Sequence, residues 1–225
     1  VAWNWKAGGA TPSKTYAVTV VSDSGNKYRF DGFGTSAVTL NLQEGGTYTF
    51  NYPAAHPFRF STTANGTHGG GSEYTTGVTH VSSTQTKIVV AASAPALYYY
   101  CSVHSGMGGA VNTNATFGSS NFSGSTISTV SANVDAGFSI VSYTGTGSNA
   151  TVGHGLSSAP EIVICKNRID VSSWSFNGSA GGLVYGSNKL LLQTTDGFIN
   201  DANEVTSANS TTFSVGTSGA TNGAS

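Results

Sequence analysis

One short segment of this 225-residue chain concentrates side chains that bind metals. Residues 97–109 read Leu-Tyr-Tyr-Tyr-Cys-Ser-Val-His-Ser-Gly-Met-Gly-Gly, so Cys101, His104 and Met107 follow one another at three-residue steps. Thiolate, imidazole and thioether are the donors that copper prefers in a trigonal site of two His and one Cys with a weak axial Met. The segment therefore predicts a copper site that needs one more histidine.

His56 is the histidine best placed to complete this site. It closely follows an expected strand at residues 47–52, in the sequence Tyr-Pro-Ala-Ala-His-Pro, and a neighbouring strand can bring it to the Cys101 loop. A site closed by four protein donors suits electron transfer or structural stabilisation, because catalysis needs an open position. The residues alone leave open that Cys101 is a core residue and that the site is structural or empty.

The other histidines and the second cysteine have less specific surroundings. His68 and His80 fall in polar stretches and are expected to be solvated, whereas His154 lies between two glycines in an expected turn with a structural role. Cys165 ends the run 162–165, which is apolar on both faces and predicts a central strand with an inert core thiol. We do not expect the two cysteines to pair, since their surroundings differ.

The elements that must position these residues are strands. Short β-branched and aromatic runs separated by Gly, Asn, Asp and Ser predict an all-β chain, with no sustained helical periodicity. First-half strands are expected at 16–21, 27–30, 37–42, 47–52, 58–61, 87–91 and 97–101, which suits a Greek-key sandwich. A Gly/Thr/Ser-rich stretch between Thr62 and Thr86 is expected to be a surface loop. Second-half strands are expected at 137–143, 161–166, 174–176, 183–185, 189–193 and 212–215.

The amino-acid composition excludes some classes of binding partner for this protein. Only 8% of the residues are charged and the formal net charge is -1, whereas ordinary domains have about 25% charged residues. This excludes charge-led binding to nucleic acid or an anionic membrane, and no apolar run approaches the roughly 20 residues of a membrane span. Near-zero net charge favours association, so the composition suggests a protein that lives in an assembly or outside a cell. The start at Val1 suggests a processed or excised piece.

The first half resembles the cupredoxins, which are small blue-copper Greek-key sandwiches. The resemblance covers roughly residues 13–110 and depends on the strand Gly-Thr-Tyr-Thr-Phe at 46–50 and on Cys-x2-His-x2-Met, an amicyanin-type ligand loop. It implies copper ligands at His56, Cys101, His104 and Met107. Two departures are Pro57, which lacks the backbone N–H that usually steadies the Cys-bearing loop, and the long Gly-rich loop with His68.

The second half resembles a β-sandwich module found in fibre and appendage proteins of marine bacteriophages. The similar segments include 125–147, 152–156, 159–168 and 213–219. In that module the last strand reads much like Val1-Ala2-Trp3-Asn4-Trp5, which here stands at the opposite end of the chain. The resemblance implies a virion or extracellular fibre component in which this assembly strand completes its own second domain or that of a neighbouring copy.

These inferences give an all-β chain of two β-sandwich domains without an enzymatic role, since residues 137–225 offer no nucleophile–base pair, suitable carboxylate pair or phosphate loop. Residues 1–10 form the assembly strand, 11–111 the cupredoxin-like domain, 112–136 a linker or irregular edge, and 137–225 the fibre-like sandwich. Two alternatives remain: an exported type 1 copper electron-transfer protein, and a carbohydrate-binding module for a host-surface glycan.

Overall fold

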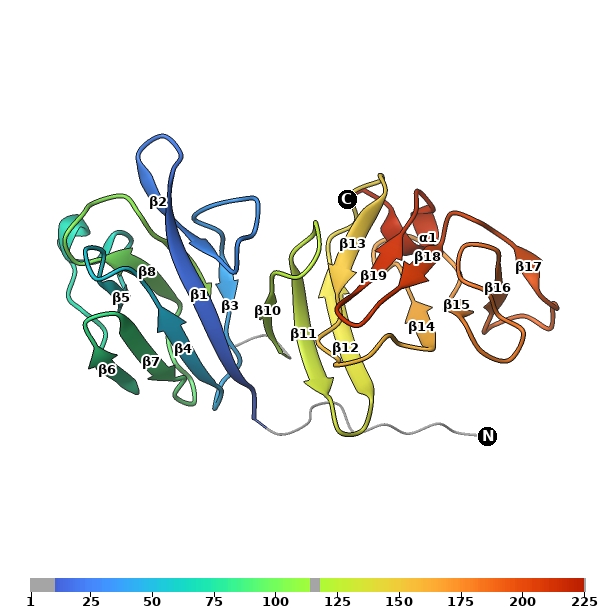
Figure 1. Cartoon of the computed structure of the whole chain (residues 1–225), viewed down its shortest axis with the longest axis horizontal. Coiled ribbons are helices and arrows are strands. Elements are labelled where there is room, and N and C mark those ends of the chain that lie inside the picture. Colours follow the sequence, from blue (N-terminus) through green and yellow to red (C-terminus); the bar gives the residue numbers. More distant parts are fainter. Residues whose placement is uncertain (1–10, 114–117, 225) are drawn as a thin grey trace. The chain divides into compact units, whose positions relative to one another are not determined.

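The computed structural model describes residues 11–113 and 118–224. Nineteen of the elements are strands, and the only α-helix in this described part is the short α1 (Gly219–Asn222), so the all-β prediction is confirmed. The chain divides into two compact units between Phe122 and Ser123, drawn in Figure 1. The assembly strand expected at Val1–Trp5 lies outside the described residues. Within the described ranges, no helix is both long and apolar enough to cross a membrane.

The first unit contains two sheets that enclose an aromatic core. The larger sheet has the order β2-β1-β4-β7-β6. Its strands are β1 (Ser13–Ser22), β2 (Asn26–Phe30), β4 (Thr47–Asn51), β6 (Val78–Ser82) and β7 (Gln85–Val89). The smaller sheet has the order β3-β9-β8-β5. Its strands are β3 (Leu40–Asn41), β5 (Phe58–Ser61), β8 (Leu97–Cys101) and β9 (Gly109–Asn112).

Alternating aromatic residues explain why these two sheets pack together. Phe50 of β4 and Phe58 of β5 stack with ring centroids 4.6 Å apart, and Phe58 stacks on Tyr99 of β8 at 5.3 Å. All three side chains are fully buried. Because residues two apart in a strand face the same side, each sheet presents an apolar inner face, and β5 and β8 pack against the core.

The second unit consists of three groups of strands. β11 (Ser128–Asn133) pairs with β12 (Phe138–Tyr143). A sheet of order β13-β19-β18 contains β13 (Ala150–Gly153), β18 (Val205–Ala208) and β19 (Thr212–Val215). A sheet of order β14-β15-β16-β17 contains β14 (Ile162–Cys165), β15 (Ser175–Gly178), β16 (Asn188–Leu191) and β17 (Ile199–Asn200). Val152, Cys165 and Phe213 belong to its buried core.

Residues 112–136, expected as a linker or irregular edge, contain regular strands and buried side chains. This stretch contains β10 (Ser119–Asn121) and the whole of β11, and the buried ring of Phe122 stacks on Phe30 at 5.6 Å in the first core. The Ser-rich composition suggested an irregular segment, but several of these serines are buried in strands and have hydrogen-bond partners. The Ser120 hydroxyl accepts from the Asn41 amide at 2.8 Å, and the Ser128 hydroxyl donates to the Gly153 carbonyl at 2.8 Å. Satisfied hydroxyls can be buried at little cost.

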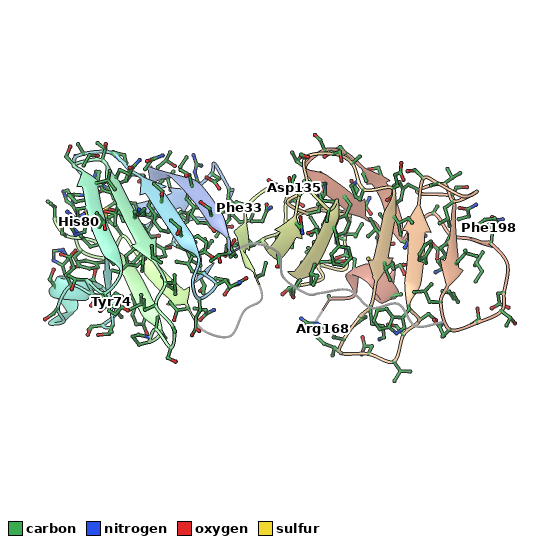
Figure 2. The ribbon with its side chains drawn as sticks, turned by 90° about the horizontal axis from the view of Figure 1, so that it is seen from below. Phe33, Tyr74, His80, Asp135, Arg168 and Phe198 are labelled. Atoms are coloured by element: carbon green, nitrogen blue, oxygen red, sulfur yellow. The ribbon has the colours of Figure 1, made fainter. Side chains whose placement is uncertain are left out.

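Three further expectations about the strands are wrong. The surface loop expected between residues 62 and 86 contains a 3-10 turn (Gly66–Gly69) and the strand β6, from which His80 projects (Figure 2). Residues 183–185, expected as a strand, form a turn in which Leu183 is buried. The run Ile162–Cys165 is an edge strand rather than a central one, since β15 is its only neighbour in its sheet among the described residues.

Candidate metal centre

Strands β5 and β8 bring the first two candidate ligands to the same end of the first unit. Phe58 is opposite Cys101 in their antiparallel register, so His56, two residues before β5, lies beside the cysteine that ends β8. The Ser102 amide donates to the Pro57 carbonyl at 3.2 Å. Pro57 lacks an N–H, and its carbonyl instead ties the ligand loop to the His56 segment.

The structure brings three of the four predicted ligands together. One donor atom from each of His56, Cys101 and His104 lies within 4.8 Å of the other two. The Cys101 Sγ is 3.7 Å from His104 Nδ1, and the two imidazole rings have centroids 4.6 Å apart. Met107 follows on the same loop with a fully buried side chain. This is a compact set of soft and borderline donors.

The surroundings of His56 favour a neutral imidazole with an available nitrogen. The Nδ1 atom of His56 is buried and has no hydrogen-bond partner among the described residues, a state that is costly for a polar atom. Burial, and secondarily the neighbouring His104, lower the pKa of His56 below its usual value. The neutral imidazole, which is the form that binds metals, is therefore favoured. The His104 amide lies 3.4 Å from the Cys101 Sγ and donates to it.

Residues of the Gly-rich insertion support the ligand loop. The Asn65 side chain donates to the Ser105 hydroxyl at 2.9 Å and accepts from the Gly106 amide at 2.8 Å. The Nε2 atom of His68 lies 3.0 Å from the Cys101 carbonyl oxygen. His68 is exposed, as expected, but it also contacts the residue that carries the thiol. This insertion therefore positions the loop from Cys101 to Met107.

Strand β2 supports the site from the core side. The Tyr28 hydroxyl donates to the His56 carbonyl at 2.7 Å, and the Tyr28 amide donates to the Met107 carbonyl at 3.0 Å. Burial first, and then the hydrogen bond with the Cys101 thiol, raise the pKa of Tyr28 well above its ordinary value. The hydroxyl thus stays protonated next to the sulfur. Lys27 binds the Gly106 carbonyl through its ammonium group.

Gly108 is required by the close approach of the ligand loop to β8. A Cβ atom built at this position would lie 1.7 Å from the Tyr99 carbonyl oxygen, which is far inside van der Waals contact. The chain can therefore return into β9 immediately after Met107 only if residue 108 has no side chain. The need for glycine at position 108 therefore sets the place of Met107, directly before the chain turns into β9.

The remaining histidines lie apart from the cluster. His80 bonds Glu73 through Nε2 at 2.6 Å and Thr86 through Nδ1 at 3.2 Å. His154 is buried directly after β13, and its ring nitrogens contact the Asn209 carbonyl at 3.0 Å and the Leu156 amide at 3.1 Å. Such satisfied contacts agree with the structural role expected for His154.

Sequence reasoning missed Tyr28, Asn65 and the contact made by His68. The dipeptide Asn65-Gly66 indicates a turn with left-handed backbone, which the structure has at both residues, but it does not indicate what the side chain binds. Tyr28 carries no local signal, because its partners at the site, His56 and Met107, are 28 or more residues away in the sequence. Such contacts depend on the register of whole strands.

Fold and cluster together define an all-β protein with a candidate metal centre in its first unit. A family model described as Domain of unknown function (DUF7483) matches residues 110–225, slightly more than half of the chain, and the chain belongs to this family. The match covers the second unit and the last strands of the first, but not the cluster. A search of curated proteins found no match.

Proposed function

We propose that the first unit binds one copper ion through His56, Cys101, His104 and Met107. The observation that carries this proposal is the close approach of two imidazoles and a thiol, within 4.8 Å, at a place where the buried Nδ1 of His56 has no other partner. Two imidazoles and one thiolate with a nearby thioether form the donor set of blue-copper sites. The resemblance of residues 13–110 to cupredoxins supports the same assignment.

The protein's own residues have defined tasks in such a centre. The His104 amide donates to the sulfur, and Tyr28 keeps a protonated hydroxyl beside it. Asn65 and His68 hold the loop, so the donors are positioned before the ion arrives. When bound, copper supplies one-electron redox chemistry or a covalent staple between strands. His104 is exposed, so the cluster is accessible from solvent.

Copper titration of the 225-residue chain tests this proposal. We expect one ion per chain and a visible thiolate-to-Cu(II) absorption band. The band should disappear in Cys101→Ser and persist in Cys165→Ser, a matched control that removes the other buried thiol. Absence of the band in the wild-type chain, or its persistence in Cys101→Ser, would remove the proposal. Preference for zinc without a visible band would indicate a structural zinc site instead.

A second candidate role is that of a structural component of a virion fibre, an appendage or another extracellular filament. The observation that favours it is the large number of exposed apolar side chains in the second unit of a chain with a net charge of only -1. Exposed apolar patches mark interaction surfaces, and a nearly uncharged chain repels its copies weakly. In this role the copper ion would staple the first unit.

Electron microscopy of the native assembly tests this second role. Repeated copies on particles or filaments would support a structural component. A monomer with a reversible redox potential and fast electron exchange with a partner would support the electron-transfer alternative instead. Binding of a host-surface glycan stays a prediction that a glycan array can examine separately.

A further inference from the structure

Strand β14 combines the composition of a central strand with the position of an edge strand. Its four residues, Ile162 to Cys165, are all apolar and include no Pro, Gly or charge, the devices by which proteins usually protect an edge. Val163 and Cys165 face the core of the second unit. Ile162 and Ile164 face the other way and are 49% and 42% exposed. Within the described ranges, no backbone hydrogen bond leaves the edge opposite β15.

The exposed face of β14 continues across its sheet. Ile164 is opposite Phe176 of β15, and Phe176 is opposite Leu190 of β16, so these three side chains share one face. Trp174, two residues before Phe176, and Leu192, two residues after Leu190, extend this outer face and are 49% and 53% exposed.

Phe198, immediately before β17 (Figure 2), is 51% exposed. A contiguous apolar face of this kind, beside an edge that has no partner among the described residues, is typical of a surface that pairs with another chain.

We propose that the free edge of β14 accepts residues Val1–Trp5 of a second copy as an added strand. This segment lies outside the described residues, has five residues against the four of β14, and carries no charged side chain. In an extended strand Val1, Trp3 and Trp5 share one face. Main-chain hydrogen bonds would satisfy the edge, and the two indoles would cover the outer face beside Ile162 and Ile164.

The proposal rests on the assembly role proposed above and names its contact. Donor and acceptor are different surfaces of the chain, so the contact is heterologous and can continue from copy to copy. Each chain has one donor segment and one acceptor edge. A filament therefore needs both to be intact in every copy.

Variants that lack one half of the contact test the proposal. The donor variant is Trp3→Ala with Trp5→Ala, and the acceptor variant is Ile164→Lys. Val171→Lys, which places the same charge on a fully exposed residue of the second unit, is the matched control. By sedimentation velocity, wild type and control should form concentration-dependent oligomers, and each half-variant should be monomeric. An equimolar mixture of the two half-variants should form dimers, since one intact donor meets one intact acceptor.

A peptide of residues 1–9 gives a second readout. By fluorescence anisotropy it should bind the donor variant, whose edge is free, and lose affinity at least about tenfold for the acceptor variant. Ile162→Lys serves if Ile164→Lys does not fold, with circular dichroism as the check. Oligomers that persist in both half-variants would leave the assembly role standing and overturn this contact. A wild-type chain that stays monomeric would overturn both, including the case in which its own Val1–Trp5 fills the edge.

Discussion

The two units differ in how their apolar side chains are covered. Of fourteen exposed large hydrophobic side chains in the described ranges, three valines lie in the first unit and eleven side chains, including Trp174 and Phe198, lie in the second. The first unit instead buries Phe50, Phe58 and Tyr99 completely between its sheets. A closed core can hold four side chains in a fixed arrangement at its end. An open apolar face is suited to binding another chain.

The two units should differ most in how much free energy of unfolding they lose when one aromatic ring is removed from each. Phe58→Ala removes a fully buried ring that stacks on Phe50 and Tyr99, and should lower the free energy of unfolding by about 3–5 kcal/mol. Phe198→Ala, at a half-exposed position, should change it by less than about 0.5 kcal/mol. Denaturant titration followed by circular dichroism measures both. Equal losses would contradict the contrast between a closed and an open unit.

The buried thiol of Cys165 makes the stability of the second unit depend on pH. Burial, the largest cause, raises the pKa of Cys165 to about 12 from an ordinary 9.0. The folded state then keeps a proton that the unfolded state loses, so stability is fully present below pH 9 and is lost as pH rises towards 12. The loss is roughly 4 kcal/mol at most. Cys165→Ala should show a flatter decline in denaturant titrations between pH 9 and 11. If stability declines equally in Cys165→Ala and the wild type, then groups other than Cys165 cause the loss of stability at high pH.

Copper should stabilise only the first unit. An ion that binds the folded form at a free concentration of about 100 times its Kd adds about 2.7 kcal/mol. Thermal melting should therefore show one transition that moves upward with copper and one that does not. The shift should be absent in Cys101→Ser and retained in Cys165→Ser. An upward shift of both transitions, or of neither, would contradict a site confined to the first unit.

The contrast between the units also explains how much the sequence could predict. β5 and β8 match their predicted bounds, because dense aromatic residues at alternating positions define both strands and core. The ligand spacing at 101, 104 and 107 is local, so it too could be recognised. β13 and β18 were missed, since Ala, Thr, Ser and Gly provide little apolar alternation.

The run 162–165 was placed wrongly for a different reason. Its composition indicates a neighbour on both sides, and among the described residues the structure provides one, at β15. The composition of a strand indicates which neighbours it can pair with. It does not indicate whether the described part of the chain contains a second neighbouring strand. This mismatch, together with the exposed Ile162 and Ile164, motivates the proposed strand addition.

The smallest effect should come from the insertion that supports the ligand loop. Asn65→Gly removes two side-chain hydrogen bonds but keeps the left-handed backbone, which Gly tolerates. We expect a loss of about 1–2 kcal/mol without metal and faster release of copper. Asn51→Ala, which removes an exposed bond to Gln85, is the control and should not change the release rate. Equal release rates in both variants would mean that the insertion does not position the loop.

X-ray absorption at the copper edge identifies the donor atoms of a bound ion and so tests the proposed ligand set. We expect a first shell of two nitrogen donors and one short sulfur donor in the wild-type chain, with the short sulfur lost in Cys101→Ser and one nitrogen lost in His56→Ala. A shell of oxygen and nitrogen donors only, the same in all three proteins, would contradict the assignment of His56, Cys101 and His104 as a copper site.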